Sequence, residues 1–351
     1  MRREARSFVT LDGLRGVAAF AIFIFHTDLF IGLQIPETFL AVDFFFALSG
    51  FVIAHAYTER LRTGMSRRSF LMLRLVRLYP LYILGTAIGM SIFLPISHAD
   101  GFSQLAIEII AAVLLLPSPV TELLYPFNFP AWTLFHELLI NGAFAALSNL
   151  LSRVVLCGIV AISAVILAGY AIWLGSLDTS NGWVHFEGGL VRVSFSFFAG
   201  VLVYRIWQKW PAPLNLPAAL LGAILLSLLS LPVPPHYAAV YHVSLVLLAF
   251  PLLLWLGASS TPIRPIAIVC SWLGEISYAV YVLHLPMIAA IRMLHTPRDP
   301  LWRLVVIAAA AHFATRFFDR PVRRWLVAWL GVAHDARPVR RMSGTSCGPL
   351  A

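Results

Sequence analysis

Long apolar runs separated by short polar segments dominate this chain of 351 residues. Each run is close to the roughly 20 residues with which a helix crosses a bilayer. The pattern predicts an all-α, polytopic transmembrane helical bundle of about ten spans. The predicted spans are Gly13 to Ile31, Phe39 to Tyr57, Leu78 to Ile96, Ala131 to Leu150, Val154 to Leu174, Leu190 to Trp207, Leu214 to Leu231, Ala238 to Leu256, Ile276 to Ile291 and Leu301 to Phe318.

A further apolar run, Leu105 to Leu116, is too short to span a bilayer and is closed by Pro117 and Pro119. It predicts one short re-entrant or interfacial segment. If this run is left out of the span count, the arginine-rich segment Arg60 to Arg77 and both termini fall on the cytoplasmic side. That orientation satisfies the positive-inside rule.

The sequence predicts one membrane domain, residues 1–330, and a tail, residues 331–351. The tail is rich in Arg, Gly, Ser and Pro, which predicts a disordered cytoplasmic segment. Arg15 interrupts the first apolar run and no small-residue cleavage pattern follows it, so we expect an uncleaved first span.

The composition agrees with a membrane protein, because 60% of the residues are hydrophobic and 12% are charged. Soluble domains have about 45–50% and about 25%, which excludes a typical cytosolic enzyme and a disordered chain. The net charge of +9 comes from basic clusters between apolar runs, and no nucleic-acid partner is expected. The three cysteines show no metal-ligand spacing, so we expect no metal site.

Ionisable residues inside predicted spans are the functional candidates, because burying them in lipid is costly. Arg15 and His26 lie on the first span, eleven residues apart, which returns them to nearly the same helical face about 16 Å apart. We expect both to face one cavity, with Arg15 suited to a phosphate and His26 to a proton. The alternatives are a positive-inside anchor for Arg15 and a helix-bridging core histidine for His26.

Asp43 lies early in the second span, across a short external turn from His26. An antiparallel hairpin of these spans brings the two to similar depth, so Asp43 is predicted to orient the imidazole or stabilise its charged form. A carboxylate that caps its helix is the alternative. The following Ser49-Gly50 is typical of close helix packing.

His136 and Glu137 are adjacent in the outer part of the fourth predicted span. Neighbouring residues of a helix point about 100° apart, so we expect only one of them to face the cavity. Glu137 is the candidate, because a buried carboxylate without a role is the costlier group. An ion pair or exposure at the interface is the alternative.

The ninth predicted span carries a polar stripe, Ser277, Tyr281 and His284, at positions i, i+4 and i+7. This spacing places all three on one helical face. We expect the stripe to line an interior and contact substrate, the alternative being hydrogen bonds between helices alone.

Basic residues crowd the entrance to the third predicted span, and Arg74 and Arg77 are nearest to it. Such clusters commonly set topology or contact anionic lipid. Arg74 and Arg77 can also hold a phosphorylated cofactor.

In this order along nearly the whole chain, these motifs resemble the acyltransferase 3 family, the integral membrane O-acyltransferases that modify sugars of envelope polysaccharides. The motifs are Leu11-Asp12-Gly13-Leu14-Arg15-Gly16 with His26, Val42-Asp43-Phe44-Phe45-Phe46-Ala47-Leu48-Ser49-Gly50-Phe51, Arg74-Leu75-Val76-Arg77-Leu78-Tyr79-Pro80, Trp132-Thr133-Leu134 with Glu137, and Ile276-Ser277-Tyr278 with Tyr281, His284 and Pro286.

The resemblance implies a ten-helix domain of the bacterial inner membrane that takes acyl-CoA from the cytoplasm and acylates a saccharide or lipid-linked saccharide. It makes Arg15 and His26 the essential pair, Glu137 the acidic residue of the tryptophan motif and Arg77 a member of the basic motif. The chain departs from the family at Asp319-Arg320-Pro321, where glutamate usually precedes the proline.

The residues and the resemblance together give a mechanistic hypothesis. The CoA phosphates bind at Arg15, Arg74 and Arg77, and the pantetheine arm carries the thioester to His26. His26 is then either a general base, with Asp43 or Glu137 stabilising the imidazolium, or the carrier of the acyl group. The sequence leaves both open.

Two other classes compete with an enzyme. A proton-coupled transporter or flippase also needs buried histidines and carboxylates, but it predicts inverted repeats, which this sequence does not show. A structural or lipid-binding membrane protein does not need His26, Asp43, Glu137 and His284 together inside spans.

Overall fold

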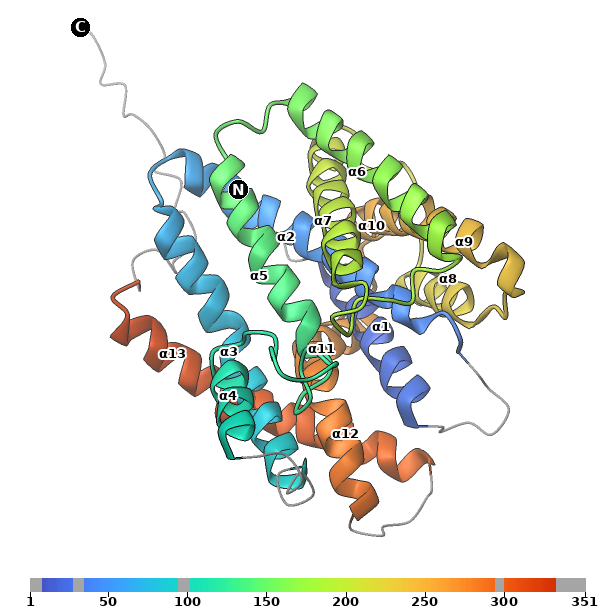
Figure 1. Cartoon of the computed structure of the whole chain (residues 1–351). Helices are drawn as coiled ribbons and strands as arrows, with labels where there is room; N and C mark the ends of the chain where they lie inside the picture. Colours follow the sequence, from blue (N-terminus) through green and yellow to red (C-terminus); the bar gives the residue numbers. More distant parts are fainter. Residues whose placement is uncertain (1–7, 28–34, 94–101, 294–299, 333–351) are drawn as a thin grey trace, which may run out of the picture.

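The computed structural model describes residues 8–27, 35–93, 102–293 and 300–332. Regular structure in these ranges is helical, apart from one isolated β-bridge between Leu123 and Gly182. The elements, shown in Figure 1, are α1 (Val9–Thr27), η1 (Thr38–Leu40), α2 (Ala41–Arg62), α3 (Arg67–Phe93), α4 (Phe102–Val113), α5 (Ala131–Leu147), α6 (Arg153–Leu174), α7 (Phe186–Lys209), α8 (Ala218–Ser230), α9 (Pro235–Ser244), η2 (Leu245–Ala249), α10 (Phe250–Ser259), α11 (Arg264–Met293), α12 (Pro300–Phe313), η3 (Ala314–Asp319) and α13 (Arg320–Trp329).

The prediction of an all-α, polytopic bundle is confirmed. A helical segment lies at the place of every predicted span, with α9, η2 and α10 joined in one rod (Figure 1). Seven of the described helices are long and apolar enough to cross a bilayer. Since α5 has 17 residues and α8 has 13, the total of about ten spans stays a prediction.

Helix α3 begins at Arg67 rather than at the predicted Leu78. Hydropathy finds the apolar part of a helix, whereas this helix continues through its charged first turns. The Ser66 hydroxyl accepts the backbone N–H three residues later at 3.0 Å and so caps the new start. Arg74 and Arg77 therefore lie within α3, facing other helices, and not in a loop before it.

The helix pairs α1 with α11 and α2 with α7 form the most extensive packing of the bundle. In the second pair, Gly50 of α2 lies against the backbone carbonyl of Phe197, and Gly200 of α7 lies against that of Ala47. Glycines allow this backbone approach, since any side chain there meets the facing carbonyl. The predicted close-packing role of Ser49-Gly50 is thus met by Gly50.

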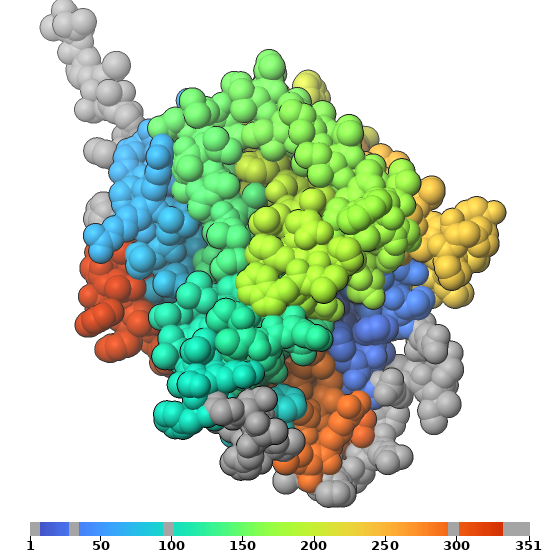
Figure 2. All heavy atoms as spheres, viewed as in Figure 1, coloured from blue at the N-terminus to red at the C-terminus, as the bar shows by residue number. Residues whose placement is uncertain are grey.

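The short predicted segment forms α4, whose last turn is bonded to the middle of α3. The Tyr82 hydroxyl donates to the Ala112 carbonyl at 2.5 Å. Beyond α4, Asn128 reaches Gly85 and the Phe127 carbonyl reaches Gly89. Figure 2 shows this teal segment at the surface beside the orange α12. Because the chain turns back here along α3, α5 begins beside the second half of α3.

We predict that Gly50→Ala destabilises the protein by about 1–3 kcal/mol, because its methyl group overlaps the Phe197 carbonyl. Gly169→Ala is the matched control, since no atom of another element lies within 4 Å of its Cβ position. Thermal unfolding in detergent measures both. Equal melting temperatures for the two variants would show that α2 and α7 do not pack this closely.

Candidate functional site

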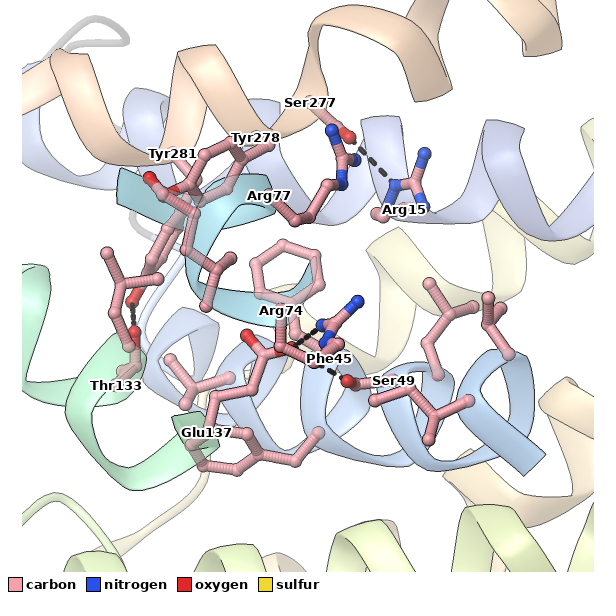
Figure 3. A pocket seen from close by; sticks show the side chains of 17 residues that line it. Arg15, Phe45, Ser49, Arg74, Arg77, Thr133, Glu137, Ser277, Tyr278 and Tyr281 are labelled. Atoms are coloured by element: carbon pink, nitrogen blue, oxygen red, sulfur yellow. Dashed lines mark hydrogen bonds and ion pairs between the residues drawn. The ribbon is translucent and has the colours of Figure 1, made fainter. Parts of the chain in front are cut away.

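A cavity lies between α1, α2, α3, α5 and α11 (Figure 3). It has about 860 Å³ of space between the atoms, its open mouth included. Its walls combine apolar side chains with polar and charged ones in similar numbers. The polar lining residues are Arg15, Ser49, Arg74, Arg77, Thr133, Glu137, Ser277, Tyr278 and Tyr281.

Arg15 is held in place from α11 and from its own helix. Its Nε donates to the Ser277 hydroxyl at 2.9 Å, and Nη2 donates to the Gly274 carbonyl at 2.6 Å. Nη2 also pairs with Asp12, one turn earlier, at 3.0 Å. The guanidinium plane is thereby fixed at the cavity wall, with its charge partly neutralised.

Arg77 lies near Arg15 at the same end of the cavity (Figure 3). Its guanidinium carbon lies 5.8 Å from the centroid of the Tyr278 ring. Within the described part of the chain, Arg77 has no hydrogen-bond or ion-pair partner. A cation that lacks a protein partner and faces a cavity is suited to an anionic ligand.

Glu137 connects α5 to α2 and α3. Its Oε1 accepts from Arg74 Nη2 at 2.6 Å and from the Ser49 hydroxyl at 2.7 Å. As predicted, Glu137 faces the cavity, whereas His136 is fully buried on another face of α5. Glu137 lies beside Arg74 in the first half of α3, and its predicted place in the outer part of the span stays a prediction.

The opposite end of the cavity is closed by Tyr281, whose hydroxyl lies 2.9 Å from the Thr133 hydroxyl. The Tyr281 ring contacts Phe45 at a centroid distance of 5.4 Å and His284 at 6.1 Å. Ser277 and Tyr281 therefore line the cavity as predicted. His284 does not line it and lies directly behind Tyr281.

His26 is half-buried and does not line the cavity that Arg15 lines. The expectation that both face one cavity is therefore wrong as stated. The His26 ring lies 5.0 Å from that of His284, and His284 in turn contacts Tyr281 of the cavity wall. The periodicity of a helix fixes the angle between two residues but not which neighbouring helix covers each of them.

Asp43 does not contact His26, and the predicted pairing is wrong. Its carboxylate pairs with Arg192 of α7 at 2.6 Å, and both side chains are fully buried. Arg192 also donates to the Phe39 carbonyl at 2.9 Å, and Ser196 donates to Asp43 at 3.3 Å. Because α2 packs along α7 rather than along α1, Asp43 faces α7. Glu137, bonded to Arg74, does not contact His26 either.

The sequence reasoning missed Arg192, although an arginine inside an apolar run is the signal that singled out the other candidates. It also missed the pair of Glu37 with His242, 2.7 Å apart, because Glu37 lies between two predicted spans. The contact of Ser49 with Glu137 has no sequence signal.

Asp319, where the closing motif departs from the family, is fully buried and pairs with Arg323 one turn later. Burial lowers the pKa of Arg323 to about 9. Arg320 pairs with Glu275 of α11 at 2.8 Å. The pair of Asp319 with Arg323 thus joins the end of η3 to the first turn of α13. Both elements lie beside α3.

The fold and site define a multi-pass helical membrane protein with an arginine-lined internal cavity. No group of three or more potential metal ligands was found among the described residues. The chain belongs to the acyltransferase 3 family, whose model, described as an acyltransferase domain, matches residues 8–315. The predicted O-acyltransferase is confirmed at the level of this family.

Two curated proteins are similar to the chain. "Protein 2 in picA locus" of Rhizobium radiobacter is 39% identical over 176 residues, which cover 46% of this chain and 92% of that protein. The peptidoglycan O-acetyltransferase OatA of Listeria monocytogenes is 23% identical over 369 residues, which cover 92% of this chain and 57% of that protein. The chain therefore spans little more than half the length of the second relative. No solved structure matches the chain.

We predict that Asp43→Ala and Arg192→Ala each destabilise the protein by about 3–5 kcal/mol, because each leaves its partner as an unpaired buried charge. The double variant is expected to lose less than the sum of the two. Thermal unfolding of the three variants in detergent measures this coupling. If Asp43→Ala abolishes acyl transfer while its melting temperature is unchanged, Asp43 takes part in the reaction and is not a structural partner.

Proposed function

We propose that this protein transfers a short acyl group from acyl-CoA to a hydroxyl of an envelope saccharide. The observation that carries the proposal is the guanidinium of Arg77, which has no hydrogen-bond or ion-pair partner among the described residues and lies beside Arg15 in a cavity with polar and apolar walls. Acyl-CoA has a matching form, with charged phosphates at one end and a long, weakly polar arm ending in the thioester.

The donor is proposed to bind with its phosphates at Arg15 and Arg77. Guanidinium groups bind phosphate through paired, charge-assisted hydrogen bonds. Arg74 is proposed as a weaker phosphate ligand, because Glu137 already neutralises it at 2.6 Å. The arm then extends past Phe45 towards Tyr281, and the cytoplasm is the side of entry because the arginine-rich helix ends lie there under the positive-inside rule.

The reaction is proposed to take place at His26, beyond the end of the cavity that Tyr281 closes, so the thioester reaches His26 only when the Tyr281 side chain moves aside. The Ile22 carbonyl lies 2.9 Å from Nδ1 of His26, and a carbonyl only accepts, so Nδ1 carries the proton. Nε2 is left as a base. It takes the proton of the acceptor hydroxyl while that oxygen attacks the thioester carbonyl. The carbon–sulfur bond then breaks, and the proton passes to the CoA thiolate.

The acceptor is proposed to be a cell-envelope or lipid-linked saccharide that enters from outside, and acetyl is the simplest acyl group. Support comes from the similarity to a relative named as a peptidoglycan O-acetyltransferase. We further propose that residues 1–330 form the catalytic domain in the bacterial inner membrane, with 331–351 as a cytoplasmic tail.

The proposed function is tested with purified protein in liposomes, supplied with acetyl-CoA and saccharide fragments. We expect thiol release that depends on the protein and a mass increase of one acetyl group on the saccharide. If no acyl-CoA tested releases a thiol, and saccharide or protons cross the liposome membrane, the result supports a transporter or flippase instead.

We predict that Arg77→Gln raises the KM for acyl-CoA about 10- to 100-fold, the effect of losing one charge-assisted contact to phosphate. Arg68→Gln is the matched control, because Arg68 lies on the same helix but is exposed and outside the cavity lining. Initial rates of thiol release at varied donor concentration measure both. An unchanged KM in Arg77→Gln places the phosphates elsewhere.

A further inference from the structure

The two histidines His26 and His284 lie on different helices, α1 and α11, with their rings 5.0 Å apart. Each ring is fixed by its own helix. Nδ1 of His26 lies 2.9 Å from the Ile22 carbonyl, and Nδ1 of His284 lies 2.6 Å from the Tyr281 carbonyl. Since carbonyl oxygens only accept, both Nδ1 atoms carry a proton and both Nε2 atoms are bare acceptors.

Nε2 of His284 is buried and has no hydrogen-bond partner among the described residues. A buried acceptor without a partner destabilises the folded protein, and such groups in native proteins call for an explanation. His284 is 1% exposed, so bulk water does not satisfy it. The neighbouring group that can supply a proton is His26 once it has become an imidazolium.

We propose that His284 is a positioning residue whose Nε2 receives the proton that His26 takes from the acceptor hydroxyl. The two Nε2 atoms share this proton, directly or through one water molecule, while the tetrahedral intermediate exists. This inference rests on the proposed function, in which His26 is the general base.

The step balances without a further reactant. The hydroxyl oxygen of the acceptor forms a bond to the thioester carbon and loses its proton to Nε2 of His26. That proton is shared with His284 until the carbon–sulfur bond breaks, and it then returns through His26 to the leaving thiolate. The products are an ester and a free thiol, and both imidazoles return to their neutral form.

The surroundings of the pair favour a single shared proton over two. Arg303 of α12 donates to the Thr27 carbonyl beside His26 at 3.4 Å, which adds a positive charge nearby. The other ring beside His284 is the phenol of Tyr281, at a centroid distance of 6.1 Å. Neither histidine forms an ion pair with a carboxylate within the described ranges. The positive charge that forms on His26 is therefore shared with the imidazole of His284.

The test compares His284→Gln with His136→Gln. Glutamine retains a hydrogen-bond acceptor but does not take up a proton. His136 is a matched control because it is also fully buried and its Nδ1 also lies near a backbone carbonyl, that of Trp132 at 2.7 Å. Its Nε2 also has no hydrogen-bond partner in the part of the chain that the structure describes. Its ring neighbours are Trp132, Phe135 and Phe186, and none is a histidine.

We expect His284→Gln to lower kcat about 100-fold, the order of one general-base contribution, with the KM for acyl-CoA and the melting temperature unchanged. His136→Gln is expected to keep kcat within about threefold of the parent. If His284→Gln does not accumulate in the membrane, His284→Asn carries the same expectation.

Near-normal kcat in either His284 variant overturns the inference, because an acceptor alone is then sufficient. A loss of kcat that is equal in the two glutamine variants also overturns it, because burial rather than proton sharing then explains the effect. Both results leave the proposed function intact, which fails only if the parent protein releases no thiol from acyl-CoA.

Discussion

Every charged side chain inside this bundle has to be paired or to face a polar cavity, because lipid hydrocarbon does not solvate an ion. The buried charges of this structure include examples of both arrangements. Asp43 and Arg192 neutralise each other at 2.6 Å in full burial, and they hold α2 against α7. Arg77 has no such partner within the described residues and faces the cavity. The first arrangement stabilises the fold, and the second requires a ligand.

The tight packing of α2 on α7 and of α1 on α11 makes the cavity possible. These pairs are drawn together at glycines, and α3 and α5 then stand around the space that remains. Because α4 and residues 114–130 turn back along α3, α5 begins beside the second half of that helix. Its seventh residue, Glu137, thereby lies opposite Arg74. A full-length span in this place would shift the carboxylate away from the arginine.

The helical class and the position of each apolar segment could be predicted from the sequence, because burial in lipid leaves a strong apolar signal. The choice of Glu137 over His136 was also predictable, from the angle between adjacent residues and the cost of an idle carboxylate. Helix α3 was placed too late, since its first turns are charged.

Which helices become neighbours could not be predicted, and the errors at the site follow from that. Asp43 was assigned to His26 on the assumption that consecutive spans pack together, but α2 packs along α7. His26 was assigned to the cavity of Arg15, but His284 and Tyr281 of α11 lie between the imidazole of His26 and that cavity. The same face of α1 therefore borders the cavity near the start of the helix, at Arg15, and contacts His284 near its end, at His26.

The most direct test of the central claim is a structure of the protein bound to an acyl-CoA analogue whose thioester is replaced by a stable thioether ketone. We predict that the phosphates lie within hydrogen-bond distance of Arg77 and Arg15, and that the carbonyl lies at the end of the cavity beside Tyr281, towards His26. A bound analogue whose phosphates lie outside this cavity, with Arg77 still unpaired, would contradict the account.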